Sequence, residues 1–149
     1  MLFGMSLQVR ESLSVDHAEQ LLAMFGAEWW TVRRSADDVG VMLRNSDLVV
    51  ALVEEATDRL AGFARVLTDE IYLAVILDVV VARDWRGRGV GRLLFEAVLN
   101  HPTIANVNSI ELVCQPDLMP FYERWGFTGA VGSSRLMRRT SDATLARPL

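Results

Sequence analysis

The residues best suited to chemistry in this chain form a glycine- and arginine-rich segment, Arg86-Gly87-Arg88-Gly89-Val90-Gly91. An apolar, β-branched run at 76–81 precedes this segment, and apolar residues at helical spacing follow it at 92–99. The pattern predicts a tight turn between a buried strand and the first turn of a helix. Glycines let backbone N–H groups approach a ligand closely, and a helix N-terminus carries partial positive charge. We therefore expect the turn to bind a phosphate or pyrophosphate group.

The spacing of the glycines separates this turn from two common phosphate-binding motifs. A dinucleotide fingerprint would need a third glycine at position 94, where the chain has Leu94. The P-loop string G-x-x-x-x-G-K-[ST] does not occur either. The segment does fit the pattern [Q/R]-x-x-G-x-[G/A], through Arg86, Gly89 and Gly91. The alternative is an ordinary strand–turn–helix unit whose glycines only permit tight packing.

A second motif lies about thirty residues further on, where the chain reads Phe121-Tyr122-Glu123-Arg124-Trp125-Gly126-Phe127. An aromatic-Tyr pair followed by Gly-Phe, after the glycine segment and at this separation, resembles the Gcn5-related N-acetyltransferase (GNAT) family. The resemblance extends over about residues 6–139. It implies an α/β fold with a central mixed sheet flanked by helices, in which two neighbouring parallel strands splay apart. In this chain those strands would be Leu77–Val81 and Ile110–Cys114.

Hydrophobic periodicity and turn residues predict the elements that must position these motifs. Ser14 and Ser35 are expected to cap the first two helices, and Gly126 is expected to end the last one. The expected helices cover about residues 15–28, 36–45, 90–100 and 116–125. The expected strands are residues 7–12, Leu48–Glu54, Leu60–Leu67, Tyr72–Val81, Ile110–Cys114 and Arg135–Arg138, the last of these following Phe127.

Composition limits the class of protein. The chain has 149 residues, 51% of them hydrophobic, which is typical of one folded domain. We expect a single domain over residues 1–149, with a tail at 140–149. No apolar run reaches the roughly 18 residues of a membrane span, and residues 1–5 do not resemble a signal peptide. These features favour a cytoplasmic protein without membrane contact, although import into a plastid or another organelle from a longer precursor stays open.

Charge and cysteine content limit the partners. A net charge of −4 argues against nucleic acid as the main partner, whereas a local basic segment suits one small polyanion. With one cysteine, Cys114, and two histidines, His17 and His101, we expect no disulfide within the chain and no metal site. A homodimer is an open possibility, since dimers are common among proteins that the chain resembles.

The resemblance implies acetyl-CoA as the acyl donor. Backbone groups of Val79, Val80 and Val81 would bind the pantetheine arm like an added strand, and the amide near Val80 would polarise the acetyl carbonyl. The glycine segment and its flanking arginine would bind the pyrophosphate, and Gln115 stands where the family often has an Asn that contacts pantetheine. The expected cofactor-binding residues are Val79, Val80, Val81, Arg86, Gly87, Arg88, Gly89, Val90, Gly91, Arg92 and Gln115.

Two residues are predicted to move protons. Tyr122 is the expected general acid for the departing thiolate, because a positioned phenol can protonate a thiolate. Asp78 is the expected general base for the amine, because a carboxylate inside an apolar strand is costly unless it is paired or functional. A role for Asp78 as the charge partner of an arginine is equally open. Glu28, Asp69 and Glu70 are rival bases.

The single cysteine bears on whether the acetyl group is transferred directly. A lone cysteine on a strand, such as Cys114, is more often a small buried apolar residue than a nucleophile. We therefore expect direct transfer from acetyl-CoA to the amine, without an acetyl-cysteine intermediate.

The acceptor is the least defined part of the site. The resemblance places it near the first two helices and the strand connections, where Trp29, Trp30, Phe63 and Tyr72 are candidates to line the pocket. The sequence therefore predicts an N-acetyltransferase that acts on a primary amine of a small molecule by direct nucleophilic attack. The alternatives are a non-catalytic acyl-CoA-binding regulatory or interaction module, and acetylation of a protein or peptide amine.

Overall fold

The computed structural model describes residues 6–146, which form two compact units divided between Leu112 and Val113. The first unit contains one five-stranded sheet with strand order β1-β2-β3-β4-β5. The first four strands pair antiparallel in sequence order, and β5 pairs parallel to β4. The strands are β1 Leu7–Arg10, β2 Leu48–Glu54, β3 Leu60–Thr68, β4 Leu73–Val81 and β5 Ser109–Leu112.

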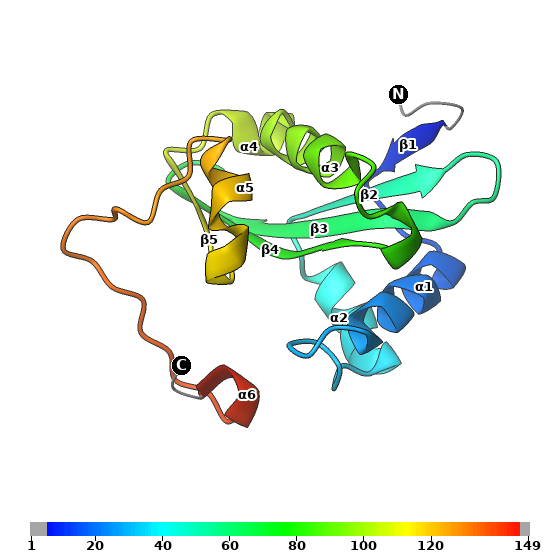
Figure 1. Ribbon diagram of the computed structural model, residues 1–149, viewed down its shortest axis with the longest axis horizontal. Helices are drawn as coiled ribbons and strands as arrows, with labels where there is room; N and C mark the ends of the chain where they lie inside the picture. Colours follow the sequence, from blue (N-terminus) through cyan, green and yellow to red (C-terminus); the bar gives the residue numbers. More distant parts are fainter. Residues whose placement is uncertain (1–5, 147–149) are drawn as a thin grey trace. The chain divides into compact units, whose positions relative to one another are not determined.

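Helices cover both faces of this sheet. Helices α1 (Val15–Gly26) and α2 (Ala36–Arg44) lie on one face, and α3 (Val90–Leu99) and α4 (Pro102–Ala105) lie on the other (Figure 1). A short 3₁₀ helix, η1 (Arg83–Trp85), stands between β4 and α3. The predicted mixed sheet with helices on both faces is therefore confirmed.

Local sequence signals set the helix ends. The Ser14 hydroxyl accepts from the N–H of His17, whose side chain returns to the Ser14 N–H, so α1 begins with a capping box. Ser35 caps α2 in the same way through the N–H of Asp38. Both predicted caps are confirmed. Ser35 also marks the end of the segment 27–35, which joins the two helices.

The hydrophobic core lies on both sides of the sheet, which explains why β2 and β3 are almost continuously apolar. On the α1 side, Phe25 meets Phe63 edge to face, with ring centroids 6.2 Å apart. On the α3 side, Gly62 of β3 allows close packing, because a Cβ there would lie 3.2 Å from Val90. The buried residues of α3 and α4 are Val90, Leu94, Phe95, Val98 and Ile104.

Strand β4 contains a β-bulge at its centre. Phe63 of β3 is opposite Val80, whereas Arg65 is opposite Leu77, so two residues of β4 oppose one residue of β3. Asp78, one of those two, has a left-handed φ of 55°, which is uncommon for a residue with a side chain. The bulge turns the second half of β4 relative to the first.

The second unit differs from the predicted pattern in several places. The expected helix at 116–125 is divided into η2 (Pro116–Leu118) and α5 (Met119–Glu123), and a short helix, α6 (Ala143–Ala146), lies in the expected tail. Gly126 has a left-handed φ of 87°, but α5 ends earlier than expected and its C-cap is Arg124, two residues before this glycine. Within the described residues, 127–139 contain no strand, so the predicted strand Arg135–Arg138 is wrong. Leu136 and Met137 are adjacent and both exposed, so this segment lacks the alternation that buries one face of a strand.

Candidate functional site

The loop between β4 and α3 has the backbone conformation that its glycines predict. Gly87 has φ 74° and Gly89 has φ 79°, both in the left-handed region. Gly89 is also the N-cap of α3 and brings no side chain to the first N–H groups of the helix. These N–H groups therefore point out of the helix end without a side-chain cap, as a phosphate-binding turn requires.

Arg86 is held by the protein at the start of this loop. Its Nη2 donates to Glu28 Oε1 at 2.7 Å, and its Nε donates to the carbonyl oxygen of Val81 at 3.2 Å. These contacts join the segment after α1 to the end of β4. Glu28, a rival candidate for the general base, is thus the ion-pair partner of Arg86.

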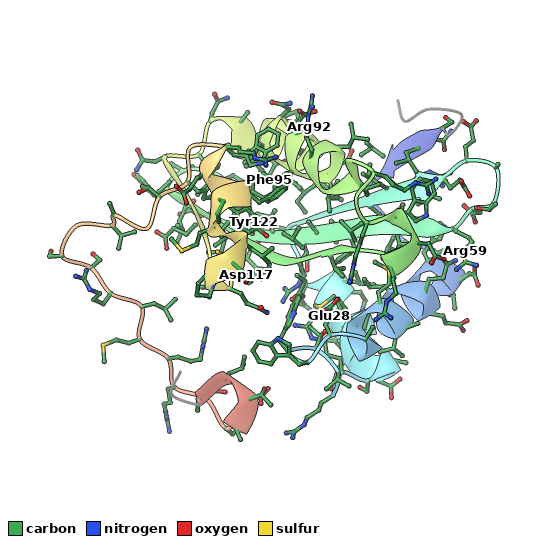
Figure 2. All side chains as sticks on the ribbon, viewed as in Figure 1. Glu28, Arg59, Arg92, Phe95, Asp117 and Tyr122 are labelled. Carbon is green, nitrogen blue, oxygen red and sulfur yellow. The ribbon has the colours of Figure 1, made fainter. Side chains whose placement is uncertain are left out.

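Two further arginines of the loop region also contact neighbouring side chains. The guanidinium of Arg88 lies 4.8 Å from the centre of the Trp85 ring. Arg92 points away from the sheet on α3 and pairs with Glu96 at 3.1 Å (Figure 2). The geometry therefore favours backbone N–H groups as the direct ligands of an anion, with the arginines supplying positive potential around them.

The pairing of β4 with β5 ends halfway along β4. Their pairing runs from Leu73 opposite Ser109 to Ile76 opposite Leu112, and β5 ends there. Within the described part of the chain, the stretch Leu77–Val81 has no strand partner on its β5 side. The parallel pairing of the two expected strands is confirmed, but the expected strand Ile110–Cys114 is observed as Ser109–Leu112. A splay of the two strands beyond Ile76 stays a prediction.

The direction of the peptide groups shows which amides reach this open edge. The N–H of Ala82 donates to the carbonyl of Ala61 at 2.8 Å, across to the β3 side. Since peptide groups alternate along a strand, the amide of Val80 also faces β3, and the amides of Val79 and Val81 face the open edge. The geometry thus favours Val79 and Val81, rather than Val80, for hydrogen bonds to a ligand beside β4.

A pocket of about 280 Å³ adjoins the loop on the α1 side. Its lining is mainly apolar and includes three arginines, Arg59, Arg83 and Arg86. It lies beside the end of β4 and η1. The lining residues are Gln20, Ala23, Met24, Ala27, Arg59, Leu60, Val80, Val81, Ala82, Arg83, Asp84, Trp85 and Arg86.

The four acceptor candidates are not brought together. Trp29 is 55% exposed and Trp30 is half-buried in the segment after α1. Phe63 is fully buried against Phe25, so its ring offers no surface to an acceptor, which corrects the expectation for this residue. Tyr72 is 71% exposed in the β3–β4 turn, at the opposite end of β4 from the glycine loop.

Asp78 lies within an ion-pair cluster. Its Oδ2 accepts from Arg34 Nη1 at 2.7 Å and from Arg65 Nε at 2.6 Å, and its Oδ1 accepts from Arg34 Nη2 at 2.9 Å. Burial by itself raises the pKa of Asp78, but hydrogen bonds and charge from both arginines lower it by more, so the pKa lies below the usual 3.8. This geometry counts against Asp78 as a base and favours the charge-partner role.

Sequence reasoning did not identify Arg34 and Arg65 as partners of this carboxylate. Arg34 comes from the segment between α1 and α2 and lies 4.6 Å over the Phe25 ring, and Arg65 comes from β3. The only signal in the sequence was the cost of a carboxylate inside an apolar strand, which calls for a partner without saying which one.

The Asp78→Asn substitution is expected to destabilise the fold, because it leaves two partly buried guanidinium groups without their counter-charge. We expect a loss of about 2–4 kcal/mol in the free energy of unfolding at pH 7, measured by urea denaturation. The folded-state pKa is depressed, so the contribution of Asp78 is complete above the unfolded pKa of about 3.9 and lost as pH falls through the folded value. The wild-type and variant curves should therefore approach each other as pH falls below about 4 and converge only below the folded-state pKa.

The exposed Asp37 of α2 supplies a matched control for this substitution. Asp37→Asn removes the same charge outside the cluster and should change stability by about 0.5 kcal/mol or less. An Asp78→Asn variant as stable as wild type at pH 7 would contradict the assigned role of the cluster.

The other rival bases belong to a turn. The Asp69 carboxylate accepts N–H groups of Ile71, Tyr72 and Leu73 between β3 and β4. These hydrogen bonds lower its pKa. Glu70 is the next residue of the same turn, with φ 67°. From Leu73 to Asp78 the strand rises by about 17 Å, so both carboxylates lie well away from the bulge.

Tyr122 belongs to the second unit. It lies on α5 (Figure 2), is 8% exposed, and packs between Phe121 and Phe127 with ring centroids 5.1 and 6.3 Å away. Burial, with a smaller effect from Cys114, raises the pKa of Tyr122 to about 12. The phenol is therefore protonated throughout the neutral range, as a general acid must be before it acts.

Two other residues of this unit were singled out from the sequence. Cys114 is half-buried, and burial followed by the charge of Asp117 raises the pKa of its thiol. A thiol kept protonated in this way is a weak nucleophile, which favours direct transfer over an acetyl-cysteine intermediate. Gln115 is the half-buried N-cap of η2. Its contact with pantetheine stays a prediction.

The described residues contain neither a candidate membrane span nor a candidate metal cluster. None of the helices within 6–146 is long and apolar enough to cross a membrane. The same residues contain no group of three or more His, Cys, Asp or Glu side chains placed to hold a metal ion.

Comparisons with known proteins give a consistent result. A family model of the acetyltransferase (GNAT) domain matches residues 16–139. The chain is 31% identical over 123 residues to the uncharacterized N-acetyltransferase ycf52 of Pyropia yezoensis, covering 81% of this chain and 68% of that protein. It is 31% identical over 99 residues to serotonin N-acetyltransferase 2, chloroplastic, of Oryza sativa subsp. japonica, covering 64% and 48%. A crystal structure from Xanthomonas campestris pv. campestris, described as belonging to the GNAT family, matches with a TM-score of 0.77 at 26% identity, covering 91% and 93%.

The chain therefore belongs to the GNAT acetyltransferase family, whose members use acetyl-CoA. The family resemblance inferred from the two motifs is confirmed, and so is the fold. The chain spans 68% and 48% of the length of the two curated relatives named above.

Proposed function

We propose that this protein transfers the acetyl group of acetyl-CoA to a primary amine of a small molecule by direct nucleophilic attack. The observation that carries the proposal is the joint geometry of β4 and the loop that follows it. The strand has an open edge from Leu77 to Val81, and the loop presents uncapped helix N–H groups immediately beyond that edge. A ligand with an amide-containing arm and a pyrophosphate matches both features.

The residues of the first unit supply the binding part of the reaction. The N–H groups at the start of α3 would hold the pyrophosphate, and the amides of Val79 and Val81 would hydrogen-bond the pantetheine arm. At the thioester, an amide on this edge would stabilise the negative charge that develops on the carbonyl oxygen. The amine nitrogen bonds to the carbonyl carbon, and the carbon–sulfur bond then breaks.

Two protons must be accounted for. The departing sulfur takes one proton, for which Tyr122 is the proposed donor because its raised pKa keeps it protonated. The neutral amine loses one proton as it forms the amide, and the Tyr122 phenolate takes one proton back from solvent, so the protons balance. Asp78 is occupied by two arginines and Glu28 by one, so water that carries the amine proton to solvent fits the geometry better than either carboxylate.

A ligand-dependent unfolding experiment tests the donor part of this proposal. Acetyl-CoA or CoA at about a hundredfold its dissociation constant should stabilise the protein by about 2.7 kcal/mol, or roughly 5–10 °C in melting temperature. ATP and NADH carry phosphates but lack pantetheine, and they should shift the melting temperature much less. An equal shift with ATP would contradict the role of the β4 edge, and no shift with acetyl-CoA would contradict the proposal.

A further inference from the structure

The cluster of Arg34, Arg65 and Asp78 carries more positive than negative charge. One carboxylate faces two guanidinium groups, which leaves a net charge of +1. The Asp78 side chain is 5% exposed and the Arg65 side chain is 15% exposed, so water screens this charge less than it would at the surface. The excess charge is therefore a fixed property of the sheet face that α1 and α2 partly cover.

The hydrogen bonds of Arg65 use only one side of its guanidinium. Its Nε donates to Asp78, whereas its Nη1 and Nη2 donate to none of the residues that the structure describes. Four N–H groups thus remain on the outer edge of a group whose orientation Asp78 fixes. A planar guanidinium edge held in this way matches the two oxygens of a carboxylate or a phosphate.

The cluster is adjacent to the point where the acetyl group is expected. The pairing of β4 with β5 ends at Ile76, and Asp78 is two residues further along the unpaired edge of β4. Arg65 is opposite Leu77 on β3, so its side chain emerges beside the same point. Arg34 comes from the segment 27–35 between α1 and α2. An amine that reaches the thioester from this face passes next to the cluster.

We propose that Arg65, oriented by Asp78 and assisted by Arg34, binds a carboxylate or phosphate of the acceptor, so that the preferred acceptor is a primary amine that also carries an anionic group. This inference rests on the proposed acetyltransferase function and adds the substrate class. The net positive charge also disfavours acceptors with several ammonium groups, since like charges repel in a partly desolvated site.

The test compares amines that differ only by the anionic group. One pair is O-phosphoethanolamine and ethanolamine, and the other is tyrosine and tyramine. For each amine, binding to the CoA-loaded protein is measured by calorimetry, and kcat/KM is measured with acetyl-CoA. The anionic member of at least one pair should be favoured about tenfold or more in both measurements, which is the range for one charge-assisted contact. A preference in the first pair would indicate that the site binds a phosphate, and a preference in the second pair would indicate that it binds a carboxylate.

Substitutions of Arg65 test whether this residue causes the preference for anionic amines. In Arg65→Met the advantage of the anionic amine should fall to within about threefold of its partner, and in Arg65→Lys it should be intermediate because the charge remains and the planar edge is lost. Arg33→Met is the matched control, since it removes an exposed arginine of the same segment 27–35, and it should keep the wild-type preference. The wild-type comparison does not depend on whether the variants fold.

The outcomes separate the two proposals. If ethanolamine and tyramine have kcat/KM values equal to or higher than those of their anionic partners, the inference is overturned and the proposed acetyl transfer is unaffected. Selective binding of the anionic amines without acetyl transfer would support the inference and overturn the proposed function. An anionic preference that is unchanged in folded Arg65→Met would overturn the role of this residue. Absence of both binding and transfer for all four amines would overturn the inference about the acceptor.

Discussion

Replacing Gly89 by valine should weaken the binding of acetyl-CoA by about a hundredfold or more. Gly89 has φ 79° at the N-cap of α3. A β-branched residue is strongly disfavoured in this region, with a cost of about 1–2 kcal/mol or more. The loop must therefore move, and the N–H groups at the start of α3 no longer converge on one phosphate. Each lost charge-assisted hydrogen bond removes about 1.5–3 kcal/mol of binding.

The control for this substitution is a glycine with a similar conformation elsewhere. Gly132 has φ 69°, and no atom lies within 4 Å of the position its Cβ would occupy. Gly132→Val therefore imposes comparable backbone strain without touching the loop. Calorimetry should show wild-type affinity for acetyl-CoA in Gly132→Val. An unchanged affinity in folded Gly89→Val would contradict the assignment of the loop.

Replacing Tyr122 by phenylalanine should lower kcat by about a hundredfold while the affinity for acetyl-CoA stays within about threefold of wild type, if the phenol is the general acid. The change removes one oxygen from a ring that packs between Phe121 and Phe127, so α5 should keep its packing. Steady-state kinetics and calorimetry together give the two quantities. A wild-type kcat would remove Tyr122 from the mechanism.

The pH dependence gives a second check on this residue. Because the pKa of Tyr122 is raised to about 12, its hydroxyl should contribute no ionisation to the profile of kcat between pH 6 and 10. The Tyr122→Phe profile should therefore be lower than that of wild type but parallel to it over this range. A wild-type profile with a step near pH 8–9 that Tyr122→Phe abolishes would show that the phenol titrates far below its expected pKa.

Much of the first unit could be predicted because its signals are local. Serines at 14 and 35 mark helix starts by their own hydrogen bonds, and β2 forms over the predicted Leu48–Glu54 because its apolar run is bounded by turn residues. The glycine loop was identified from residue types alone, since a left-handed φ at Gly89 requires what glycine offers.

The features that escaped prediction depend on contacts between distant residues. The partners of Asp78 are 44 and 13 positions away in the chain, and the bulge that places this carboxylate depends on the register between β3 and β4. The failed strand at Arg135–Arg138 has the same cause, because a strand forms only where a partner is in register. The sequence predicts Phe63 as an acceptor contact because it does not show that Phe25 of α1 covers this ring.

Acetyl transfer to an amine is the central claim, and detecting the acetylated product tests it most directly. The purified protein, acetyl-CoA and a panel of primary amines would be incubated, with CoA release and the acetylated amine quantified in parallel by thiol titration and mass spectrometry. The proposed reaction predicts equal amounts of free CoA and N-acetyl product with at least one amine, and neither in Gly89→Val at the same acetyl-CoA concentration. Tight binding of acetyl-CoA with no acetylated product from any amine would contradict the claim and identify a binding module that retains the fold.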